Sequence, residues 1–314
     1  MITLNASTLV AQISPRGAGL NGVWIKGQPH SLVLGAPDPE VTASALPYAG
    51  TVVGPVANRI SDSAVTIDGV VWRMPRNEGT TCLHSGPDGL HGQHWSVKDQ
   101  SSRHVTLVCT LPHGACGLPG HREFQAIYHL TDAGTLRLDL SARTDCTTLM
   151  NLTHHPYWNL DGAPTVGGHS LHVSADTYLP VDNRTCPTGQ IATVTGTPYD
   201  FTHPRRIPTD VTLDANFCLA SAPRTFPQDV ACLTAADGPS LIIATTEPGL
   251  QIYNGTGFAP SSAALHDGRV LIPGAGIALE PQRWPDAPTN PHFPGILLHA
   301  DTPYRQVTEY KISL

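Results

Sequence analysis

A ten-residue segment carries the side chains with the clearest potential for chemistry. Residues 151–160 read N-L-T-H-H-P-Y-W-N-L and bring His154 and His155 together with amides, a hydroxyl and two aromatic rings. Only 14% of the chain is charged, so such a cluster stands out. An imidazole titrates near neutral pH and can donate or accept a proton during a reaction. Amides and polar aromatic rings suit a ligand rich in hydroxyl groups. The segment therefore predicts proton transfer on a sugar-like molecule.

The two histidines lie near the end of a strand-like segment. Neighbouring side chains of a strand point to opposite faces, so one imidazole can enter a cleft while the other packs or meets solvent. Glu280 directly follows the apolar run 276–279 and is a candidate general base, with a strand-end salt bridge as the alternative. Arg59, after Asn58, could clamp ligand hydroxyls with its planar set of donors, or form a structural ion pair.

Three further histidines raise the question of a metal. His84, His91 and His94 follow one another closely, but their spacing matches no familiar zinc pattern and no pair of cysteines accompanies them. We therefore predict no metal site. His84 lies in a loop beside Ser85 and Gly86, which favours a hydrogen-bonding residue of a binding site, with a plain surface histidine as the alternative.

Strands must position these residues. The chain has 29 glycines and 29 prolines among 314 residues, which leaves little room for long helices and favours short strands joined by turns. Apolar residues alternate with polar ones over 105–111, 136–141, 171–175 and 308–314, and Asp68-Gly69 between two β-branched runs is typical of a type I′ hairpin. We predict one all-β domain over residues 1–314, a large antiparallel β-sandwich.

Charge and cysteine usage narrow the function class. A formal charge of -7 argues against nucleic acid and against an anionic membrane surface as partners. No apolar stretch approaches the roughly 18 to 20 residues of a membrane span, so we expect a soluble, cytoplasmic protein. Seven scattered cysteines without a CxxC pair favour reduced thiols over a disulfide framework or a cysteine nucleophile.

Several motifs in order resemble one family. Residues 54–60 (G-P-V-A-N-R-I), 82–86 (C-L-H-S-G) and 151–160 are similar to its G-R-x-A-N-R-I, L-H-G-G and N-L-T-N-H-S-Y-F-N-L segments. Residues 178–182 (Y-L-P-V-D), 214–217 (D-A-N-F), 249–255 (G-L-Q-I-Y-N-G) and 279–294 continue the match. The chain resembles the aldose 1-epimerases, or galactose mutarotases, over most of its length.

The resemblance implies a galactose-mutarotase-like sandwich with an open cleft for a monosaccharide. It implies His155 as general acid, protonated at neutral pH, and Glu280 as general base, ionised. The residues that it implies for holding the ring oxygen and hydroxyls are Asn58, Arg59, His84, Asp214 and Gln251. The implied reaction interconverts α and β anomers by ring opening and reclosure, and it requires no metal or other cofactor.

Departures from the family pattern flank these residues. They are Pro55 for Arg, Ser85 for Gly, His154 for Asn, Pro156 for Ser and Ala215 for His. We expect them to affect substrate preference, with Pro55 altering one cleft wall and His154 adding a sugar contact. Two alternatives stay open at this point. One is epimerisation of a phosphorylated sugar, for which Arg205-Arg206 is the adjacent basic pair. The other is a sugar-binding module without catalysis.

Overall fold

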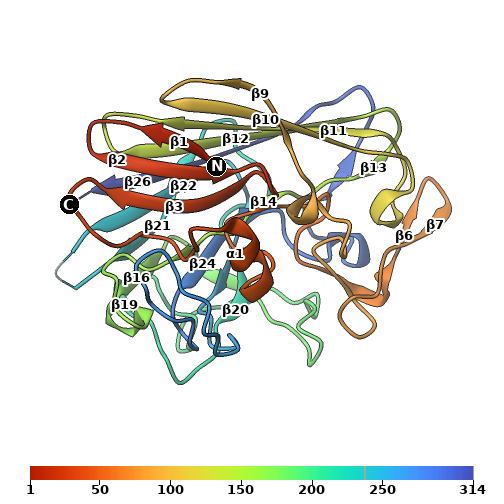
Figure 1. Ribbon diagram of the computed structural model, residues 1–314. Coiled ribbons are helices and arrows are strands. Elements are labelled where there is room, and N and C mark those ends of the chain that lie inside the picture. The colour runs from red at the N-terminus through yellow and green to blue at the C-terminus, as the bar shows by residue number, and fades with distance from the viewer. Residues whose placement is uncertain (237, 314) are drawn as a thin grey trace.

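The larger of two main sheets has nine strands. The computed structural model describes residues 1–236 and 238–313. In that part of the chain every pair of named strands is antiparallel. In spatial order the large sheet contains β19 (Arg205–Arg206), β16 (Ser170–Val173), β21 (Gln228–Thr234), β22 (Ser240–Thr245), β26 (Tyr304–Ser313), β12 (Thr135–Thr144), β11 (Arg122–Leu130), β10 (His104–Leu111) and β9 (Ser96–Gln100) (Figure 1).

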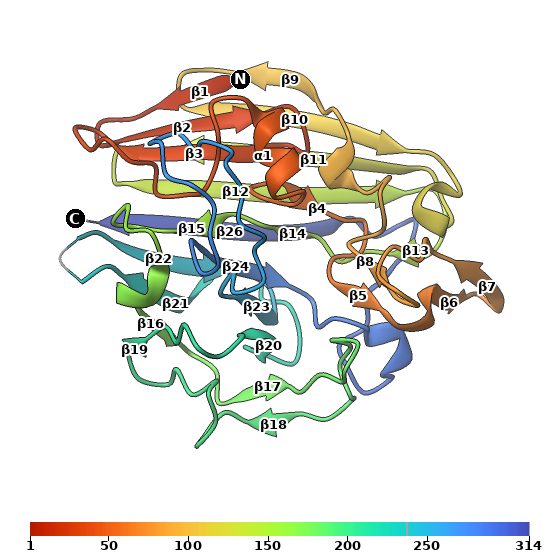
Figure 2. The ribbon, with the colours of Figure 1, turned by 60° about the horizontal axis from the view of Figure 1, so that its bottom comes forward.

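The second sheet has six strands, of which β23, β20, β17 and β18 lie below β10, β11, β12 and β26 of the first sheet in Figure 2. Its order is β15 (Tyr157–Trp158), β24 (Ile277–Gln282), β23 (Gly249–Tyr253), β20 (Asp214–Cys218), β17 (Thr177–Leu179) and β18 (Ala192–Thr193). A three-stranded sheet near the N-terminus contains β1 (Ile2–Asn5), β2 (Leu9–Ser14) and β3 (Gly19–Ile25).

Short strand pairs, one α-helix and five short 3₁₀ helices complete the elements of the described residues. The 3₁₀ helices span Ser61–Ser63, Leu90–Gly92, Ala115–Gly117, Val166–Gly168 and Ala287–Thr289. The pairs are β4 (Val52–Val53) with β14 (Thr153–His154), β5 (Arg59–Ile60) with β8 (Cys82–Leu83), β6 (Ala64–Ile67) with β7 (Val70–Arg73), and β13 (Thr148–Leu149) with β25 (Leu297–Leu298). The helix α1 (Pro39–Ala45) begins after Asp38, whose side chain accepts a hydrogen bond from the backbone of Glu40. Within the described ranges, no helix is long and apolar enough to cross a membrane.

The core joins the two main sheets and confirms the predicted sandwich. Strand β12 alternates as its sequence predicts, because Leu136, Leu138 and Leu140 are buried while their neighbours are half-buried. These leucines share one apolar cluster with Ile252 of β23 and Leu279 of β24. Two sheets that bury their apolar faces against each other form a sandwich.

The strands predicted from alternation are present. They correspond to β10, β12, β16 and β26, whereas Leu314, placed at the end of the last strand, lies outside the described residues. Asp68 and Gly69 both have positive φ, as a type I′ turn requires, and they join β6 to β7. The extent of a single domain over residues 1–314 stays a prediction.

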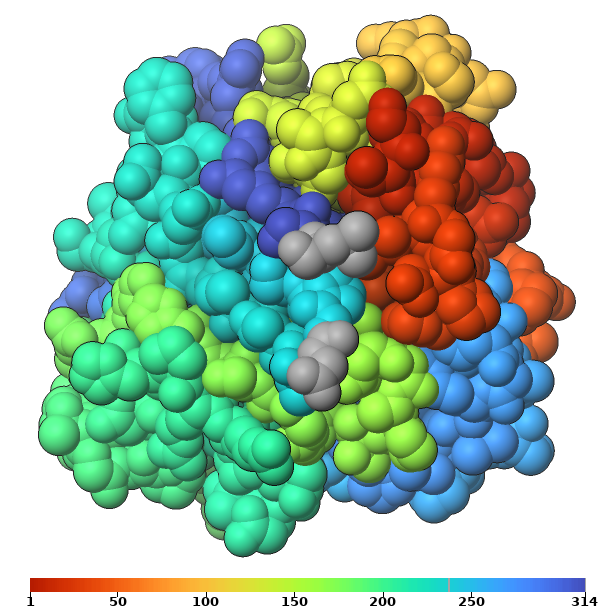
Figure 3. All heavy atoms as spheres, turned by 90° about the vertical axis from the view of Figure 1, so that its left-hand side faces the viewer, coloured from red at the N-terminus to blue at the C-terminus, as the bar shows by residue number. Residues whose placement is uncertain are grey.

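Strand β24 is buried on both faces, and it carries Glu280. Ile277 and Leu279 point into the main core, while Ala278 and Glu280 belong to the opposite face. The connection from β23 to β24 packs against the N-terminal part of the chain, where the backbone of His266 donates to Gly35. Figure 3 shows the light-blue atoms of this connection beside the orange-red atoms of the N-terminal part.

Candidate active site

A cavity of about 370 Å³ opens on the face of the six-stranded sheet that points away from the core. Strands β24, β23 and β20 form its floor, and segments around residues 46–48, 58–59, 83–84, 155–157 and 257–258 form its walls. All seven residues predicted from the sequence line this one cavity: Asn58, Arg59, His84, His155, Asp214, Gln251 and Glu280. Residues spread over more than 200 positions of sequence therefore meet at one site.

Glu280 and His155 form a close pair at the base of the cavity. His155 Nε2 lies 3.3 Å from Glu280 Oε1, and both side chains are almost fully buried. The carbonyl of Pro281 accepts hydrogen bonds from the side chains of Thr153 and Gln306, at 3.0 and 2.9 Å, and these contacts hold the end of β24. The register of the sheet places Gln251 directly opposite Glu280. Contacts from three elements thus fix the backbone of β24 beside Glu280.

Burial gives this pair an unusual proton affinity. The pKa of Glu280 is raised well above its ordinary value, first by burial and then by the nearby charge of Asp214, with Arg59 opposing the shift. Burial lowers the pKa of His155 to about 4. The sequence resemblance implied a protonated His155 and an ionised Glu280. In the buried pair, burial instead shifts both groups towards their neutral forms.

His84 is fixed as a neutral hydrogen-bond donor. The backbone N–H of Asn58 donates to His84 Nδ1 at 3.0 Å, so the ring hydrogen of a neutral imidazole resides on Nε2. Burial lowers the pKa of His84 well below its ordinary value. Ser85, one of the departures from the family pattern, fastens the same loop, because its hydroxyl accepts from the N–H of Val56 and donates to the carbonyl of Val56. The loop geometry thus selects one tautomer.

Arg59 forms a structural ion pair and also lines the cavity, so it fits both alternatives left open by the sequence. Its guanidinium makes two hydrogen bonds to Glu78, at 2.6 and 2.9 Å, and lies 3.8 Å from Asp214 while also lining the cavity. Gln251 Nε2 donates to Asp214 Oδ1 at 2.6 Å. The result is a connected set of donors and acceptors from the wall at Arg59 to the floor at Asp214 and Gln251, with orientations fixed by mutual hydrogen bonds. Glu78 was not among the residues predicted from the sequence.

The cavity is also lined by aromatic residues that were not predicted from the sequence as site residues. Tyr157, Tyr253 and Phe258 pack edge to face, with ring centroids 4.8 to 6.3 Å apart. Tyr48 lies over the histidines, with its ring 4.5 Å from His84. Tyr253 could have been found, because it lies two residues after Gln251 in the same strand and hence on the same face. We find no comparable signal for Tyr48 in its own segment.

His154 does not line the cavity, so the expectation that it contacts the sugar is wrong. As predicted for neighbouring strand residues, its side chain points away from that of His155, and it is buried in the core between Tyr128 and Tyr310. The other four departures are also absent from the described cavity lining, and Pro55 therefore does not itself form a cleft wall. The side chains of the strand-end residues Thr153 and Asn159 donate hydrogen bonds to backbone carbonyl oxygens and so stabilise the backbone.

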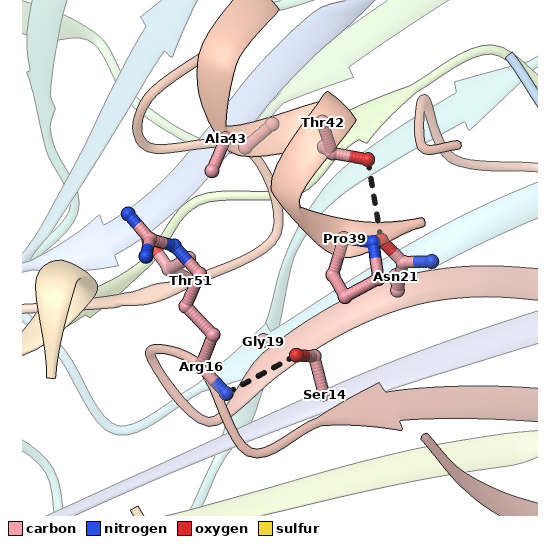
Figure 4. A pocket seen from close by; sticks show the side chains of 9 residues that line it. Ser14, Arg16, Gly19, Asn21, Pro39, Thr42, Ala43 and Thr51 are labelled. Atoms are coloured by element: carbon pink, nitrogen blue, oxygen red, sulfur yellow. Dashed lines mark hydrogen bonds between the residues drawn. The ribbon is translucent and has the colours of Figure 1, made fainter. Parts of the chain in front are cut away.

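A second hollow beside α1 is too small for a ligand. It holds about 10 Å³ between Arg16, Asn21 and Thr42, roughly the space of one water molecule (Figure 4). Of the three histidines considered for a metal, His84 lines the main cavity, His91 is buried and packs against the ring of Tyr48, and His94 is exposed. No group of three or more His, Cys, Asp or Glu side chains suited to a metal ion occurs in residues 1–236 and 238–313.

Comparison with known proteins gives a consistent picture. A family model described as aldose 1-epimerase matches residues 1–311. The chain is 35% identical to a galactose mutarotase of Rattus norvegicus, covering 99% of this chain and 93% of that protein. It is 30% identical to an aldose 1-epimerase of Escherichia coli K12, covering 99% and 94%.

Solved structures agree with the sequence comparison. A crystal structure of an aldose epimerase homologue from C. elegans superimposes with a TM-score of 0.92 at 30% identity, covering 99% of this chain and 98% of that one. A galactose 1-epimerase from Lactobacillus acidophilus gives a TM-score of 0.86 at 25% identity, covering 99% and 93%.

Proposed function

The chain belongs to the aldose 1-epimerase family, and we propose that Glu280 and His155 carry out its reaction in the cavity described above. The protein is an isomerase that interconverts the α and β anomers of an aldose. The observation that carries the assignment of residues is the pair itself. An acid and a base lie 3.3 Å apart at the base of a cavity large enough for a monosaccharide.

The reaction requires two proton transfers at neighbouring oxygens. The C1 hydroxyl must lose a proton while the ring oxygen gains one, and the C1–O5 bond then breaks to give the open-chain aldehyde. Rotation about C1–C2 presents the other face of the carbonyl, and reclosure reverses both transfers. Both oxygens are bonded to C1, so two groups as close as Glu280 and His155 can serve them together. Each positioned group contributes about 10²–10⁴-fold to such a reaction.

The single proton of the pair moves with the reaction. With the proton on His155, the imidazolium protonates the ring oxygen while the Glu280 carboxylate takes the C1 hydroxyl proton. Ring opening therefore leaves His155 neutral and Glu280 protonated, which is the form that burial favours. Reclosure returns the proton from Glu280 to O1 while His155 accepts the proton from O5. One proton thus supports both directions, and the ionised and neutral forms of the pair alternate.

The surrounding polar side chains are suited to holding the sugar. His84 offers a neutral N–H donor, and Arg59 with Gln251 and Asp214 offers a hydrogen-bonded row of donors and acceptors. Asn58 lies beside His84 in the same wall. The rings of Tyr253 and Phe258 supply the apolar surface that binding sites usually present to the less polar part of a ligand. We propose that these residues orient the sugar and that the acid–base pair performs the proton transfers.

The charges of the cavity favour a neutral sugar over a phosphorylated one. Glu280 and Asp214 line it, and the single lining guanidinium, that of Arg59, is already bonded to Glu78. A phosphate group would meet carboxylates and no unpaired cation among the described lining residues. Arg205 and Arg206 are exposed on β19, outside the cavity. We therefore propose a free aldose as substrate.

The presence of the acid–base pair favours an enzyme over a sugar-binding module without catalysis. A binding protein has no use for a buried carboxylate whose pKa is raised and whose Oε2 finds no partner in the described residues, because such a group costs stability. All seven cysteines are free thiols, which suits a reducing compartment, and we propose that the protein acts in the cytoplasm.

Polarimetry on freshly dissolved α-anomers of galactose, glucose, xylose and arabinose tests this proposal. We expect the protein to accelerate the change of rotation above the spontaneous rate, and a hexose 6-phosphate to be a poor substrate and competitor. Acceleration confined to the 6-phosphate would overturn the choice of a free aldose. Sugar binding without acceleration would favour the binding module.

A further inference from the structure

The buried imidazole of His154 has a complete and directional set of hydrogen bonds. It is 1% exposed and lies between Tyr128 of β11 and Tyr310 of β26. Its Nδ1 is 2.8 Å from the hydroxyl of Tyr310, and its Nε2 is 2.9 Å from the carbonyl oxygen of Gly50. A third contact joins Nε2 to the hydroxyl of Tyr128 at 3.1 Å. Both ring nitrogens are therefore engaged.

The chemistry of the partners fixes the tautomer of His154. A carbonyl oxygen only accepts, so Nε2 carries the hydrogen and donates it to Gly50. Nδ1 then accepts from the hydroxyl of Tyr310. The hydroxyl of Tyr128 donates to the carbonyl of Ala18 at 2.7 Å, which leaves its oxygen free to accept from Nε2–H. Burial also lowers the pKa of His154 to about 3, so this arrangement persists at neutral pH.

The Gly50 peptide is held by both histidines. Its carbonyl oxygen accepts from His154 and also from the backbone of Leu20 at 2.8 Å, while its N–H donates to the carbonyl of His155 at 2.8 Å. The N–H of His155 in turn donates to the carbonyl of Thr51 at 3.0 Å. Gly50 has a φ of +71°, and a Cβ there would lie 2.1 Å from the carbonyl oxygen of Leu20, so this close approach of the two backbones requires glycine.

This peptide belongs to a turn that reaches the cavity. The side-chain hydroxyl and the N–H of Thr51 both donate to the carbonyl of Tyr48, at 2.8 and 3.1 Å, and close the turn over residues 48–51. The ring of Tyr48 lies 4.5 Å from that of His84, 4.8 Å from His91 and 6.2 Å from His155, the last in a stacked orientation. Tyr48 also lines the cavity. A displaced Gly50 would therefore move a ring that contacts two proposed site histidines.

We propose that His154 is a positioning residue for the epimerase reaction, which holds the 48–51 turn so that Tyr48 keeps the rings of His155 and His84 in their reacting positions. The inference rests on the proposed role of His155. It gives a function to a departure from the family pattern that does not contact the substrate. In this chain the hydrogen bond from His154 to Gly50 is the feature that distinguishes a positioning role from core packing.

Two substitutions separate the contacts at the two ring nitrogens of His154. In His154→Gln the side-chain amide nitrogen can occupy the position of Nε2 and donate to Gly50. In His154→Asn the shorter amide reaches only the position of Nδ1, so a partner for Tyr310 remains while the donor to Gly50 is lost. Both variants replace an aromatic ring by an amide and remove similar packing, so each controls for the other. Thermal unfolding of both variants establishes the folded fraction in each assay.

We expect His154→Asn to lower kcat about ten- to hundredfold with KM changed less than about threefold, because small displacements of reacting groups carry costs of this size. We expect His154→Gln to restore kcat to within about threefold of the parent. In a Tyr48→Ala background the effect of His154→Asn on kcat should largely disappear, because the two changes act on one pathway.

Equal kcat for the two variants at equal folded fraction would overturn the proposal, and so would a loss confined to KM. Additive effects of the Tyr48 and His154 changes would exclude the route through Tyr48. None of these outcomes affects the proposed function, which fails only if the unmodified protein or its Glu280 and His155 variants behave contrary to the acid–base assignment.

Discussion

Replacing Glu280 by glutamine should separate catalysis from stability. Gln keeps the size of the side chain and an oxygen that can accept a hydrogen bond, but it cannot take the C1 hydroxyl proton. Loss of one positioned general base lowers the rate by about 10²–10⁴-fold. The change of rotation of an α-aldose, corrected for the spontaneous reaction, measures kcat directly. Because the sugar-binding wall is untouched, we expect KM to change by less than about threefold.

The same substitution should raise stability at alkaline pH. Glu280 is 2% exposed, and its Oε2 has no hydrogen-bond partner in the described residues. Because its pKa is raised in the folded state, the folded protein binds a proton that the unfolded chain has released. The stability of the parent therefore falls as pH rises from the ordinary carboxyl pKa towards the raised one. The variant lacks this loss.

We expect Glu280→Gln to exceed the parent by about 1–3 kcal/mol at pH 8, because only the folded parent must keep a carboxyl proton that its unfolded chain has released. The difference should vanish towards pH 4, where the glutamate is protonated in both states. Denaturant unfolding at the two pH values measures it. A variant that keeps activity within about threefold of the parent would refute the assignment of Glu280 as base. A variant that is less stable than the parent at pH 8 would refute the electrostatic reasoning.

Glu247→Gln provides a matched control outside the cavity. Glu247 is also fully buried, but it is paired with Arg283 at 2.8 Å. Removing its charge leaves a largely buried guanidinium without its partner, which should lower the free energy of unfolding by about 3–5 kcal/mol. The two Glu→Gln changes are thus expected to alter stability in opposite directions at pH 8.

Three further predictions follow from the same geometry. The pH profile of kcat/KM should be flat around neutrality. It should fall near pH 4, where a second proton binds the His155–Glu280 pair, and again at a pH well above the ordinary carboxyl pKa. A fall near pH 6.5 on the acid side would contradict the burial argument. Arg59→Lys should raise KM about tenfold, because an ammonium cannot reproduce the two bonds to Glu78, and unchanged steady-state kinetics would exclude Arg59 from sugar binding. Leu138→Ala should lower the free energy of unfolding by about 2–5 kcal/mol in denaturant titrations while the folded enzyme keeps its kcat, since Leu138 is 1% exposed in the core between the sheets.

The sequence predicted those parts of the fold that depend on local pattern. Alternation located β10 and β12, and the Asp68-Gly69 pair located the β6–β7 hairpin, because side-chain periodicity and turn chemistry are local properties. The pairing order of the two large sheets joins strands far apart in the chain, such as β12 with β26. Periodicity does not indicate which distant strands pair with each other. The galactose-mutarotase-like type of the sandwich was predicted from the family resemblance.

The site divides in the same way. The seven predicted residues lie in motifs and meet in one cavity. Glu78 and Tyr48 were missed because their roles arise from contacts with residues elsewhere, Arg59 for the one and His84 for the other. Strand geometry predicted that His154 and His155 point to opposite faces, but it did not predict which of them enters the cavity. The partners of His154, Tyr128 and Tyr310, come from two distant strands. The protonation of the acid–base pair was likewise set by burial, which the sequence alone does not measure.

Exchange between the anomers of an unphosphorylated aldose tests the central claim most directly. Two-dimensional NMR exchange spectroscopy on equilibrated galactose or glucose follows the α and β anomeric protons without disturbing the equilibrium. We expect cross-peaks between the two anomers to grow with the concentration of the unmodified protein and to return to the spontaneous level with Glu280→Gln and with His155→Ala. Exchange that stays at the spontaneous rate with unmodified, folded, sugar-binding protein, or that persists undiminished in both variants, would contradict the account.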